Sequence, residues 1–487
     1  MTPRTCVRAV LPLACVLRLD AQQPKVLTLQ LQDAVAVAQQ QGYQARAATA
    51  ARDAARYRAR AFTARLLPQL SLSGVVPNYS RAIIPVVQPD GSTLFVPQHQ
   101  TNASLNMTLS QKLPFTGGDL FVSSALARVT VAGQQSLETW SSTPFSIGLA
   151  QDIFRPNVAA WDRREQAARA ELADRQFLED METVALLTSG AFFDVYAARV
   201  ALDNAEKNAA VNDTLYKLNT GRLEVGKIGE NDLLQSELAL VRARTTLESA
   251  RLDYARATDG LRLSLGLPAG TPLEVVVSTV LPDFEADTTR AVAEALRNRA
   301  AVSEAALQDV QVRRRVTEAK LASGVGATVS ASFGLNATAP EPSLAYQHLL
   351  EARQFALAVQ LPLVQWGARR DGVQAAEADR ERVATTARST LEQIAHDARF
   401  AALQLTQARR TVALLAKADT VGAKRFEVAY NRYVIGRIML DNLYIAQTEK
   451  DQALAQFVQA LRGYWEAYYR LRLLTLFDFE TGRAIRR

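Results

Sequence analysis

Long stretches of this sequence follow a helical pattern. Residues 158–218 and 368–431 are rich in Ala, Arg, Glu and Leu, and no proline lies between Pro156 and Pro268 or after Pro362. This composition follows helix propensity closely, so each stretch predicts one long helix. At about 1.5 Å of rise per residue, each of these helices would be about 90 Å long.

Each long helix is followed by a short break that contains glycine and then by a second helix. The breaks are residues 221–229 and 432–437, and the returning helices are predicted at 231–265 and 441–475. Apolar residues three and four positions apart predict that one face of each returning helix packs against a neighbour in a coiled coil. These stripes contain Leu234, Leu238, Val241, Leu247, Ala250 and Tyr254 in the first helix, and Leu454, Phe457, Leu461, Trp465, Tyr468 and Leu471 in the second.

Shorter segments alternate apolar and small polar residues with a period of two, which predicts β-strands. Such an apolar face can pack on a soluble core, or it can face lipid while the polar face lines water. The uncharged, small polar face favours the second interpretation. The segments are 102–110, 144–150, 328–336 and 354–361, with weaker signals at 69–76 and 119–131.

The number of strands limits how the chain can enter a membrane. Past the first residues no run approaches the roughly 18 apolar residues that a spanning helix needs, so we expect a membrane segment to be built from strands. One chain offers six strands at most, whereas the smallest membrane barrels have about eight. Because an open sheet edge cannot lie in lipid, several copies must share one barrel.

The sequence also contains an internal duplication. Residues 149–244 match residues 359–454 without a gap at an offset of 210, so that Arg222 meets Arg432 and Gly226 meets Gly436. A period this long is not a solenoid repeat, whose units run about 20–50 residues. We therefore expect a duplicated module, with a first copy at 22–275 and a second copy at 276–487.

The N-terminus carries the features of a secretory signal peptide over residues 1–21. Arg4 and Arg8 precede an apolar stretch, and Ala21 offers a cleavage site. A disordered N-terminus is the alternative, and residues 12–15 also resemble a lipidation motif that would attach lipid to Cys15. Cleavage after residue 21 would remove both cysteines, which would exclude disulfides and thiol chemistry from the mature chain.

The charge and the scattered histidines predict no catalytic or nucleic-acid site. The formal charge of +7 falls to +5 without the leader and is spread along the helices, so nucleic acid is not an expected partner. The residues His99, His348 and His396 lack metal-ligand spacing, and Gly324-Val325-Gly326 lacks the third glycine of a dinucleotide fingerprint. We therefore expect no enzyme activity, no cofactor and no metal.

Several short motifs, taken in order, resemble the TolC family of outer-membrane efflux proteins. Leu67-Pro68-Gln69-Leu70 is similar to the entry to the family's first strand, and 359–370 to its strand-to-helix turn. Residues 265–268 are similar to the end of its first half, and Thr28 to Ala38 to its opening helix. The breaks at 226–234 and 436–443 resemble its helix-turn-helix tips. One departure is 101–131, with a turn at 114–118, which adds a hairpin either to the barrel or outside its wall.

The resemblance implies an α+β membrane protein that works as a homotrimer. In that family long helical hairpins form a tunnel through the periplasm, and strands of three chains share one barrel in the outer membrane. The implied partners are outer-membrane lipid, a periplasmic adaptor (membrane fusion protein) and an inner-membrane transporter of the resistance-nodulation-division or ABC type. The chain would then be the exit duct of a tripartite efflux or type I secretion system. The alternative is a periplasmic coiled-coil scaffold or adaptor without a barrel.

The tips at 221–231 and 432–442 are the candidate functional site, since bundled helices would bring them together at the periplasmic mouth. Rings of carboxylates favour cations, and links between helices hold a constriction shut. A solvated turn with ordinary surface charge is the alternative for each residue. The candidates are Glu230, Asp232, Asp441 and Asn442 for the aperture, Arg222, Arg432, Tyr433 and Arg437 for links between helices, and Gly226, Gly229 and Gly436 for turn geometry and adaptor docking.

Overall fold

The structure, a computed structural model, describes residues 26–132 and 136–486. The signal peptide, the possible lipidation site at Cys15 and the cleavage site lie outside the described residues. The chain forms two compact units. Each unit gathers three separate segments, so neither coincides with one half of the sequence: residues 1–43, 187–281 and 414–462 make the first, and 44–186, 282–413 and 463–487 the second.

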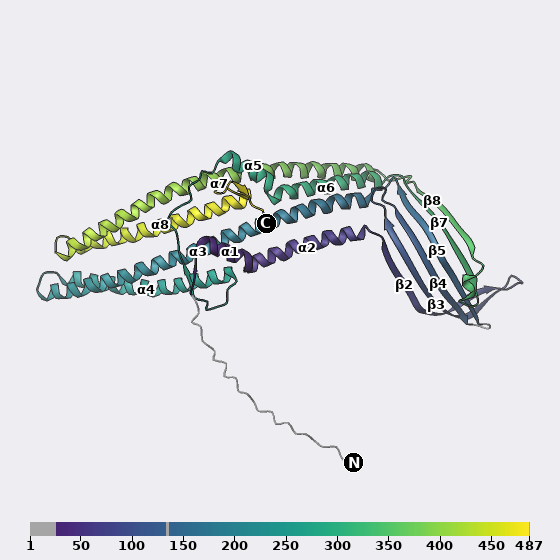
Figure 1. Ribbon diagram of the computed structural model, residues 1–487, viewed down its shortest axis with the longest axis horizontal. Helices are drawn as coiled ribbons and strands as arrows, with labels where there is room; N and C mark the ends of the chain where they lie inside the picture. The colour runs from purple at the N-terminus through teal and green to yellow at the C-terminus, as the bar shows by residue number, and fades with distance from the viewer. Residues whose placement is uncertain (1–25, 133–135, 487) are drawn as a thin grey trace, which may run out of the picture. The chain divides into compact units, whose positions relative to one another are not determined.

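Two helical hairpins dominate the chain, as the sequence predicts (Figure 1). Helices α3 (Val158–Glu224) and α7 (Ala368–Val434) have 67 residues each, and α4 (Glu230–Leu265) and α8 (Leu440–Thr475) have 36 each. Every one of these four helix boundaries in the first hairpin recurs 210 positions later in the second. The predicted helices are confirmed, and each begins and ends within a few residues of its predicted limits.

The first unit joins the N-terminal helix to the end of α4. Helix α1 (Leu31–Gln41) buries Ala34 and Ala38. Gly42 allows this approach, because a Cβ there would lie 2.9 Å from the carbonyl oxygen of Ser264. Strand β1 (Leu27–Leu29) pairs in parallel with β6 (Leu273–Val275) beside this contact, and the sequence analysis did not predict either short strand.

The predicted coiled-coil stripe of α4 is exposed over its first half in the isolated chain. Leu234, Leu238 and Val241 are 49–55% exposed. Of the predicted stripe the helix buries Ala250, and its other buried residues lie outside that stripe: Ser236, Leu240, Thr258, Leu261 and Leu265. An apolar stripe therefore remains uncovered along the first half of α4.

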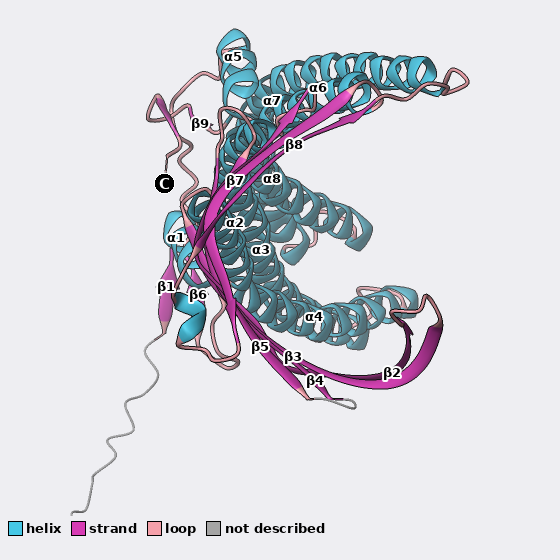
Figure 2. Cartoon of the chain, turned by 90° about the vertical axis from the view of Figure 1, so that its right-hand side faces the viewer, coloured by secondary structure: helices cyan, strands magenta, loops and turns pink. Residues whose placement is uncertain are grey.

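The second unit contains one antiparallel sheet of six strands in the order β2-β3-β4-β5-β7-β8 (Figure 2). All six predicted strands are present, and three of them extend well beyond their predicted limits. The hairpin predicted at 101–131 is part of this same sheet, as β3 and β4. The strands are β2 (Gln69–Val87), β3 (Thr93–Lys112), β4 (Asp119–Ala132), β5 (Leu137–Ile153), β7 (Gly326–Ala339) and β8 (Leu350–Gln360).

The register makes one face of the sheet apolar from β2 to β7. Directly paired residues in antiparallel strands point to the same side of a sheet. One such row runs Leu70, Leu109, Val122, Ile147 and Phe333 from β2 to β7. The adjacent row on the other face runs Ser71, Thr108, Ser123, Ser146 and Gly334. The alternation predicted strand by strand is thus continuous from β2 to β7, and on β8 the apolar row ends at Arg353, the partner of Phe333.

The two outer strands leave unpaired edges. Strands β2 and β8 each pair with one neighbour among the described residues. They differ in length, since β2 has 19 residues and β8 has 11. Between β7 and β8 a single 3-10 turn, Leu344–Tyr346, is fixed to the sheet because the Ser142 hydroxyl donates to the Ala345 carbonyl.

The remaining helices of the second unit pack around α3, α7 and the end of α8. They are α2 (Tyr43–Arg65), α5 (Thr288–Asn298) and α6 (Ala300–Ala322). Helix α5 packs against α7 through one buried cluster, which is formed by Ala295, Ile394 and Ala398.

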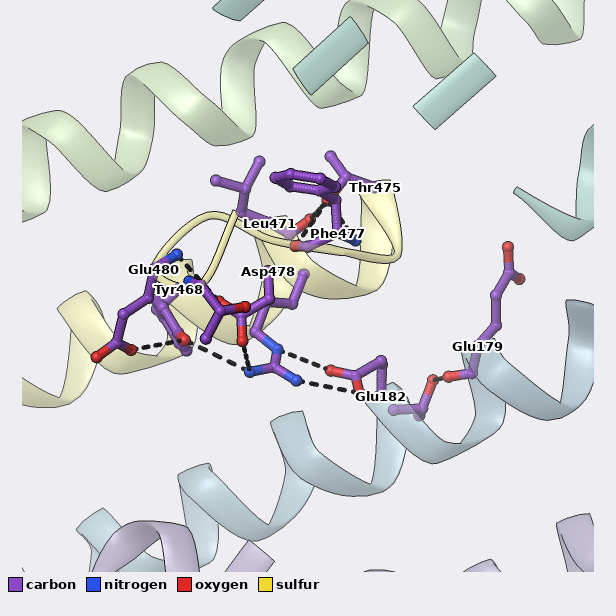
Figure 3. A network of polar contacts seen from close by, with 11 residues as sticks. Glu179, Glu182, Tyr468, Leu471, Thr475, Phe477, Asp478 and Glu480 are labelled. Carbon is purple, nitrogen blue, oxygen red and sulfur yellow. Dashed lines mark hydrogen bonds and ion pairs between the residues drawn. The ribbon is translucent and has the colours of Figure 1, made fainter. Parts of the chain in front are cut away.

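A buried ion pair fixes the C-terminal segment against α3 (Figure 3). Arg472 of α8 donates from Nε to Oε2 of Glu182 at 3.1 Å, and Glu182 is fully buried. The same guanidinium reaches Asp478 at 3.3 Å, and the Tyr468 hydroxyl donates to Glu480. Burial raises the pKa of Tyr468, while nearby Arg472 opposes that rise. These contacts tie the short strand β9 (Phe477–Asp478) to the helices.

By length and composition alone, α3 is long and apolar enough to cross a membrane, which the sequence analysis did not anticipate. Its apolar character comes in part from Phe192, Phe193 and Val195, which are at most 1% exposed. The same composition is typical of the core helix of a helical bundle.

Candidate functional site at the helical tips

The two tips have the same backbone geometry at positions 210 residues apart. Gly226 (φ 72°) and Gly436 (φ 75°) take the left-handed conformation that ends a helix. The Gly226 amide donates to Leu223 and the Lys227 amide to Arg222, and the equivalent two bonds recur after α7 at 2.9 Å. Both glycines serve the turn because a side chain at positive φ is strained, whereas the space around them is open. Gly229 is the N-cap residue of α4.

Arg222 links the first tip to the end of α7. Its Nη2 donates to the carbonyl oxygens of Tyr433 at 3.1 Å and Val434 at 2.9 Å. Carbonyls in the last turn of a helix have no partner within that helix, so this side chain from α3 caps α7. The guanidinium also lies 4.9 Å from the centre of the Tyr433 ring, in cation–π contact.

Tyr433 extends this link into a buried core. Its ring packs with Leu215, Leu440 and Leu443, so the cluster joins α3, α7 and α8. The hydroxyl donates to Oδ1 of Asn219 at 2.6 Å, and Asn219 is fully buried on α3. The Asn219 amide nitrogen has no partner among the described residues. Three contacts therefore hold the tips of the two hairpins together: the cap that Arg222 forms on α7, the packing of the Tyr433 ring, and the buried hydrogen bond to Asn219.

A second tyrosine in the same cluster lacks such a partner. The Tyr444 hydroxyl is buried and forms no hydrogen bond within the described part of the chain. Burial raises the pKa of Tyr444 to about 12. Tyr433 and Tyr444 thus differ in one respect that an experiment can use, namely whether the hydroxyl is paired.

The carboxylates named as aperture candidates lie at helix N-termini. Glu230 and Asp232 are in the first turn of α4, and Asp441 is in the first turn of α8. Gln235 Nε2 donates to Asp441 Oδ1 at 2.6 Å and so connects α4 to α8. A carboxylate in a first helical turn also stabilises the helix dipole, so each group has a structural role besides any effect on ions. Asn442 is exposed.

Of the four residues predicted to link helices, the structure brings Arg222 and Tyr433 together. Arg432 and Arg437 are exposed and form no ion pair in the part of the chain that the structure describes.

A groove with a mixed apolar and polar lining runs between α3, α4 and α8. It has a volume of about 970 Å³. Asn204 and Asn208 donate to the two carboxylate oxygens of Asp451 at 2.8 and 2.7 Å, and Lys450 donates to Asn208 at 3.1 Å. Asn212 lies on the same face, one turn further, and its Oδ1 is buried without a partner among the described residues. These polar contacts hold α8 against α3.

Sequence reasoning missed Asn219, Gln235 and Asp451. A signal for the asparagines was present, because Asn204, Asn208 and Asn212 recur every four residues and Asn219 follows seven later, which places all four on one face of α3. Their partners lie more than 200 positions away, so no local pattern identifies them.

The described residues contain no group of three His, Cys, Asp or Glu side chains arranged to hold a metal ion. The tips offer caps, hydrogen bonds and surface carboxylates. These groups can hold helices together and attract cations, and the described geometry includes no nucleophile paired with a base.

Solved structures with the same fold include outer-membrane channels. The chain is similar to the CmeC channel of Campylobacter jejuni, with a TM-score of 0.68 at 14% identity over 94% of this chain and 87% of that chain. VceC of Vibrio cholerae gives a TM-score of 0.66 at 13% identity over 92% and 96%. A membrane protein from Pseudomonas aeruginosa gives 0.67 at 15% identity over 94% and 93%.

Sequence comparison alone reaches less of the chain. No family model matches it. Protein CyaE of Bordetella pertussis is 26% identical over 151 residues, which are 28% of this chain. The chain spans about a third of the length of that curated relative, because the match covers 32% of it. The resemblance to the TolC family is confirmed at the level of the fold.

Proposed function

We propose that this chain, whose fold is that of outer-membrane efflux channels, is one protomer of a trimeric exit duct in the cell outer membrane. The strands would form the membrane wall, and the helical hairpins would extend the duct into the periplasm. At 1.5 Å per residue, the 67 residues of α3 correspond to about 100 Å of helix, enough to cross much of that space.

The observation that carries this proposal is the apolar face that runs from β2 to β7 of the six-stranded sheet. The row from Leu70 to Phe333 has the apolar character that lipid requires, and the row from Ser71 to Gly334 has the small polar character of a water-filled lumen. A periplasmic scaffold, the alternative, would leave that apolar face in water. We therefore do not favour it.

The unpaired edges support assembly from several copies. Strand β8 of one copy would pair with β2 of the next, which removes every open edge from the lipid. The uncovered stripe of Leu234, Leu238 and Val241 on α4 would pack against a neighbouring copy in the same assembly. Three copies, the number implied by the TolC resemblance, would supply eighteen strands.

We propose that the duct performs no chemistry and that a partner supplies the energy. The partners are an inner-membrane transporter, of the resistance-nodulation-division or ABC type, and a periplasmic adaptor that docks at the tips around Gly226, Gly229 and Gly436. The system would be a tripartite efflux or type I secretion system. The aperture would be formed by Glu230, Asp232, Asp441 and Asn442.

We further propose that residues 22–275 and 276–487 are two copies of one module. The equal lengths of the paired helices and their common offset of 210 residues support this division.

A matched pair of substitutions tests the membrane wall. Ile147 lies on the apolar face of β5 and its neighbour Ser146 lies on the polar face. Arginine on the lipid face near the bilayer midplane costs about 2–4 kcal/mol. We expect Ile147→Arg to abolish the heat-modifiable oligomer in the outer-membrane fraction, while Ser146→Arg assembles and changes ion selectivity in a planar bilayer. Equal assembly of both variants, or recovery of the parent chain in the soluble periplasm, would refute the proposal.

A further inference from the structure

The hairpin of β2 and β3 is longer than the sheet to which it belongs. Strand β3 pairs with β4 only over His99–Lys112, while its pairing with β2 continues to Val87 and Thr93. Residues 81–98, here called the ribbon, are therefore two-stranded over almost their whole length. Its turn is well formed, since the Gln88 amide donates to the Ser92 carbonyl at 2.7 Å.

The short edge strand β8 cannot cover this ribbon in an assembled ring. Eleven residues of β8 can pair with about the first eleven residues of β2, up to about Tyr79. The far part of β2 would remain without a neighbour on its open edge. The ribbon consequently projects past the wall at the end of the sheet away from the helices.

The polar face of β3 becomes apolar where the ribbon begins. Every second residue of this strand shares one face, and from the helical end these residues are Ser110, Thr108, Asn106, Ser104, Asn102, Gln100, Gln98, Val96 and Leu94. The partners on β2 change in step, because Ile84 pairs with Val96 and Val86 with Leu94. The face that lines water along the wall thus ends in four apolar side chains.

The opposite face of the ribbon is apolar as well, so water is a poor environment for it. Ile83, Val87 and Phe95 are 68–71% exposed. An isolated two-stranded hairpin is marginally stable in water, and contiguous exposed apolar surface marks a contact site.

The ribbon is long enough to reach the centre of the proposed barrel. Eighteen strands spaced about 4.8 Å apart and tilted about 40° enclose a cylinder of radius about 18 Å. The eight residues from Ser80 to Val87 extend about 27 Å at about 3.4 Å per residue. Figure 2 shows the far end of β2 continuing the curve of the sheet toward its hollow side.

We propose that the ribbons of neighbouring copies converge over the outer mouth of the barrel and pack on one another through Ile84, Val86, Leu94 and Val96. This inference rests on the proposed trimer. In this arrangement the apolar face of each ribbon contacts a second copy of this chain. The opening at the outer mouth is then narrower than the lumen of the barrel below it.

Cysteine cross-linking in the purified oligomer tests the contact. Val96→Cys would place identical thiols close together near the axis, so oxidation should convert much of the protein into a disulfide-linked dimer on a non-reducing gel. Asn106→Cys is the matched control, because it lies on the same face of the same strand but down in the wall, where copies are far apart. The parent chain, whose only cysteines are Cys6 and Cys15, gives the background.

A variant with a shortened β2–β3 hairpin tests whether the ribbons narrow the outer mouth of the barrel. Replacing residues 82–98 with Asn-Gly joins the paired residues Arg81 and His99 by a two-residue turn that suits a hairpin. We expect a rise in single-channel conductance with an intact oligomer. Unchanged conductance, or no dimer from Val96→Cys in an oligomer of normal size, would overturn the inference and leave the duct standing. Failure of the parent chain to form oligomers or channels would instead refute the proposed function.

Discussion

The hydrogen bond between Tyr433 and Asn219 makes the strength of the tip contact measurable. Tyr433→Phe removes the hydroxyl that donates at 2.6 Å to a fully buried amide oxygen, while the ring keeps its place among Leu215, Leu440 and Leu443. The Asn219 side chain then has neither of its polar atoms paired among the described residues, since its nitrogen already lacks a partner.

The cost follows from that lost pairing. Leaving a buried acceptor unsatisfied costs about 1–3 kcal/mol, which corresponds to an increase of about 5–150-fold in the population of separated tips. Arg222 still caps the α7 carbonyls in this variant, so the effect should be confined to the buried bond. Hydrogen exchange of backbone amides in residues 425–445, followed by mass spectrometry, reports such local opening.

Tyr444→Phe is the matched control, because its hydroxyl is buried in the same cluster without a partner. We expect exchange near the parent rate for this variant and about 5–150-fold faster exchange for Tyr433→Phe. Equal rates in the two variants would refute the assignment of the buried bond as a link. If the Tyr433–Asn219 bond also closes the periplasmic mouth of the duct, Tyr433→Phe should raise the basal single-channel conductance. Faster exchange at unchanged conductance would show that the bond stabilises the tips without closing the mouth.

Three further predictions concern other parts of the chain. Glu182→Gln removes the fully buried one of the two carboxylates that pair with Arg472 and leaves Asp478 as the other, so it should lower the free energy of unfolding by about 3 kcal/mol in denaturant titrations, whereas the double change Glu182→Leu with Arg472→Met should cost far less. Replacing Asp232 and Asp441 together with Asn should reduce cation selectivity, seen as a shift in reversal potential across a salt gradient; an unchanged potential would remove them from the aperture. Burial raises the pKa values of Tyr444, Tyr464 and Tyr469 to about 12, above the ordinary value of 10, so their contribution to stability is complete below pH 10 and is lost as the pH rises through 12. Tyrosinate absorbance should therefore show late titration that coincides with unfolding, and full ionisation of all tyrosines near pH 10 in the folded protein would contradict it.

Local pattern predicted the four long helices and the presence of every strand in the six-stranded sheet. Proline marks the start of α3 and glycine the end of each long helix, and both residues act through their own backbone geometry. The same reasoning failed for the first half of the stripe of α4. Leu234 and Leu238 have the spacing of a coiled-coil seam, but spacing does not say which copy of the chain supplies the partner.

The far half of β2 was missed because its pattern changes there. Pro77 and Pro85 interrupt the strand signal. A bulge between Val75 and Asn78 also shifts the alternation by one residue. The contacts at the tips were unpredictable for another reason, since Arg222 and Tyr433 meet across 211 positions and only the folded chain brings them together.

The equal helix lengths restrict how a molecule of this design can change in size. Arg222 reaches the last carbonyls of α7 only because both hairpins stop at the same level. Deleting two heptads from α3 and the matching residues from α4 would leave the guanidinium about 21 Å short of its acceptors. Natural or engineered relatives with longer or shorter hairpins should therefore have gained or lost the same number of residues in each of the four long helices.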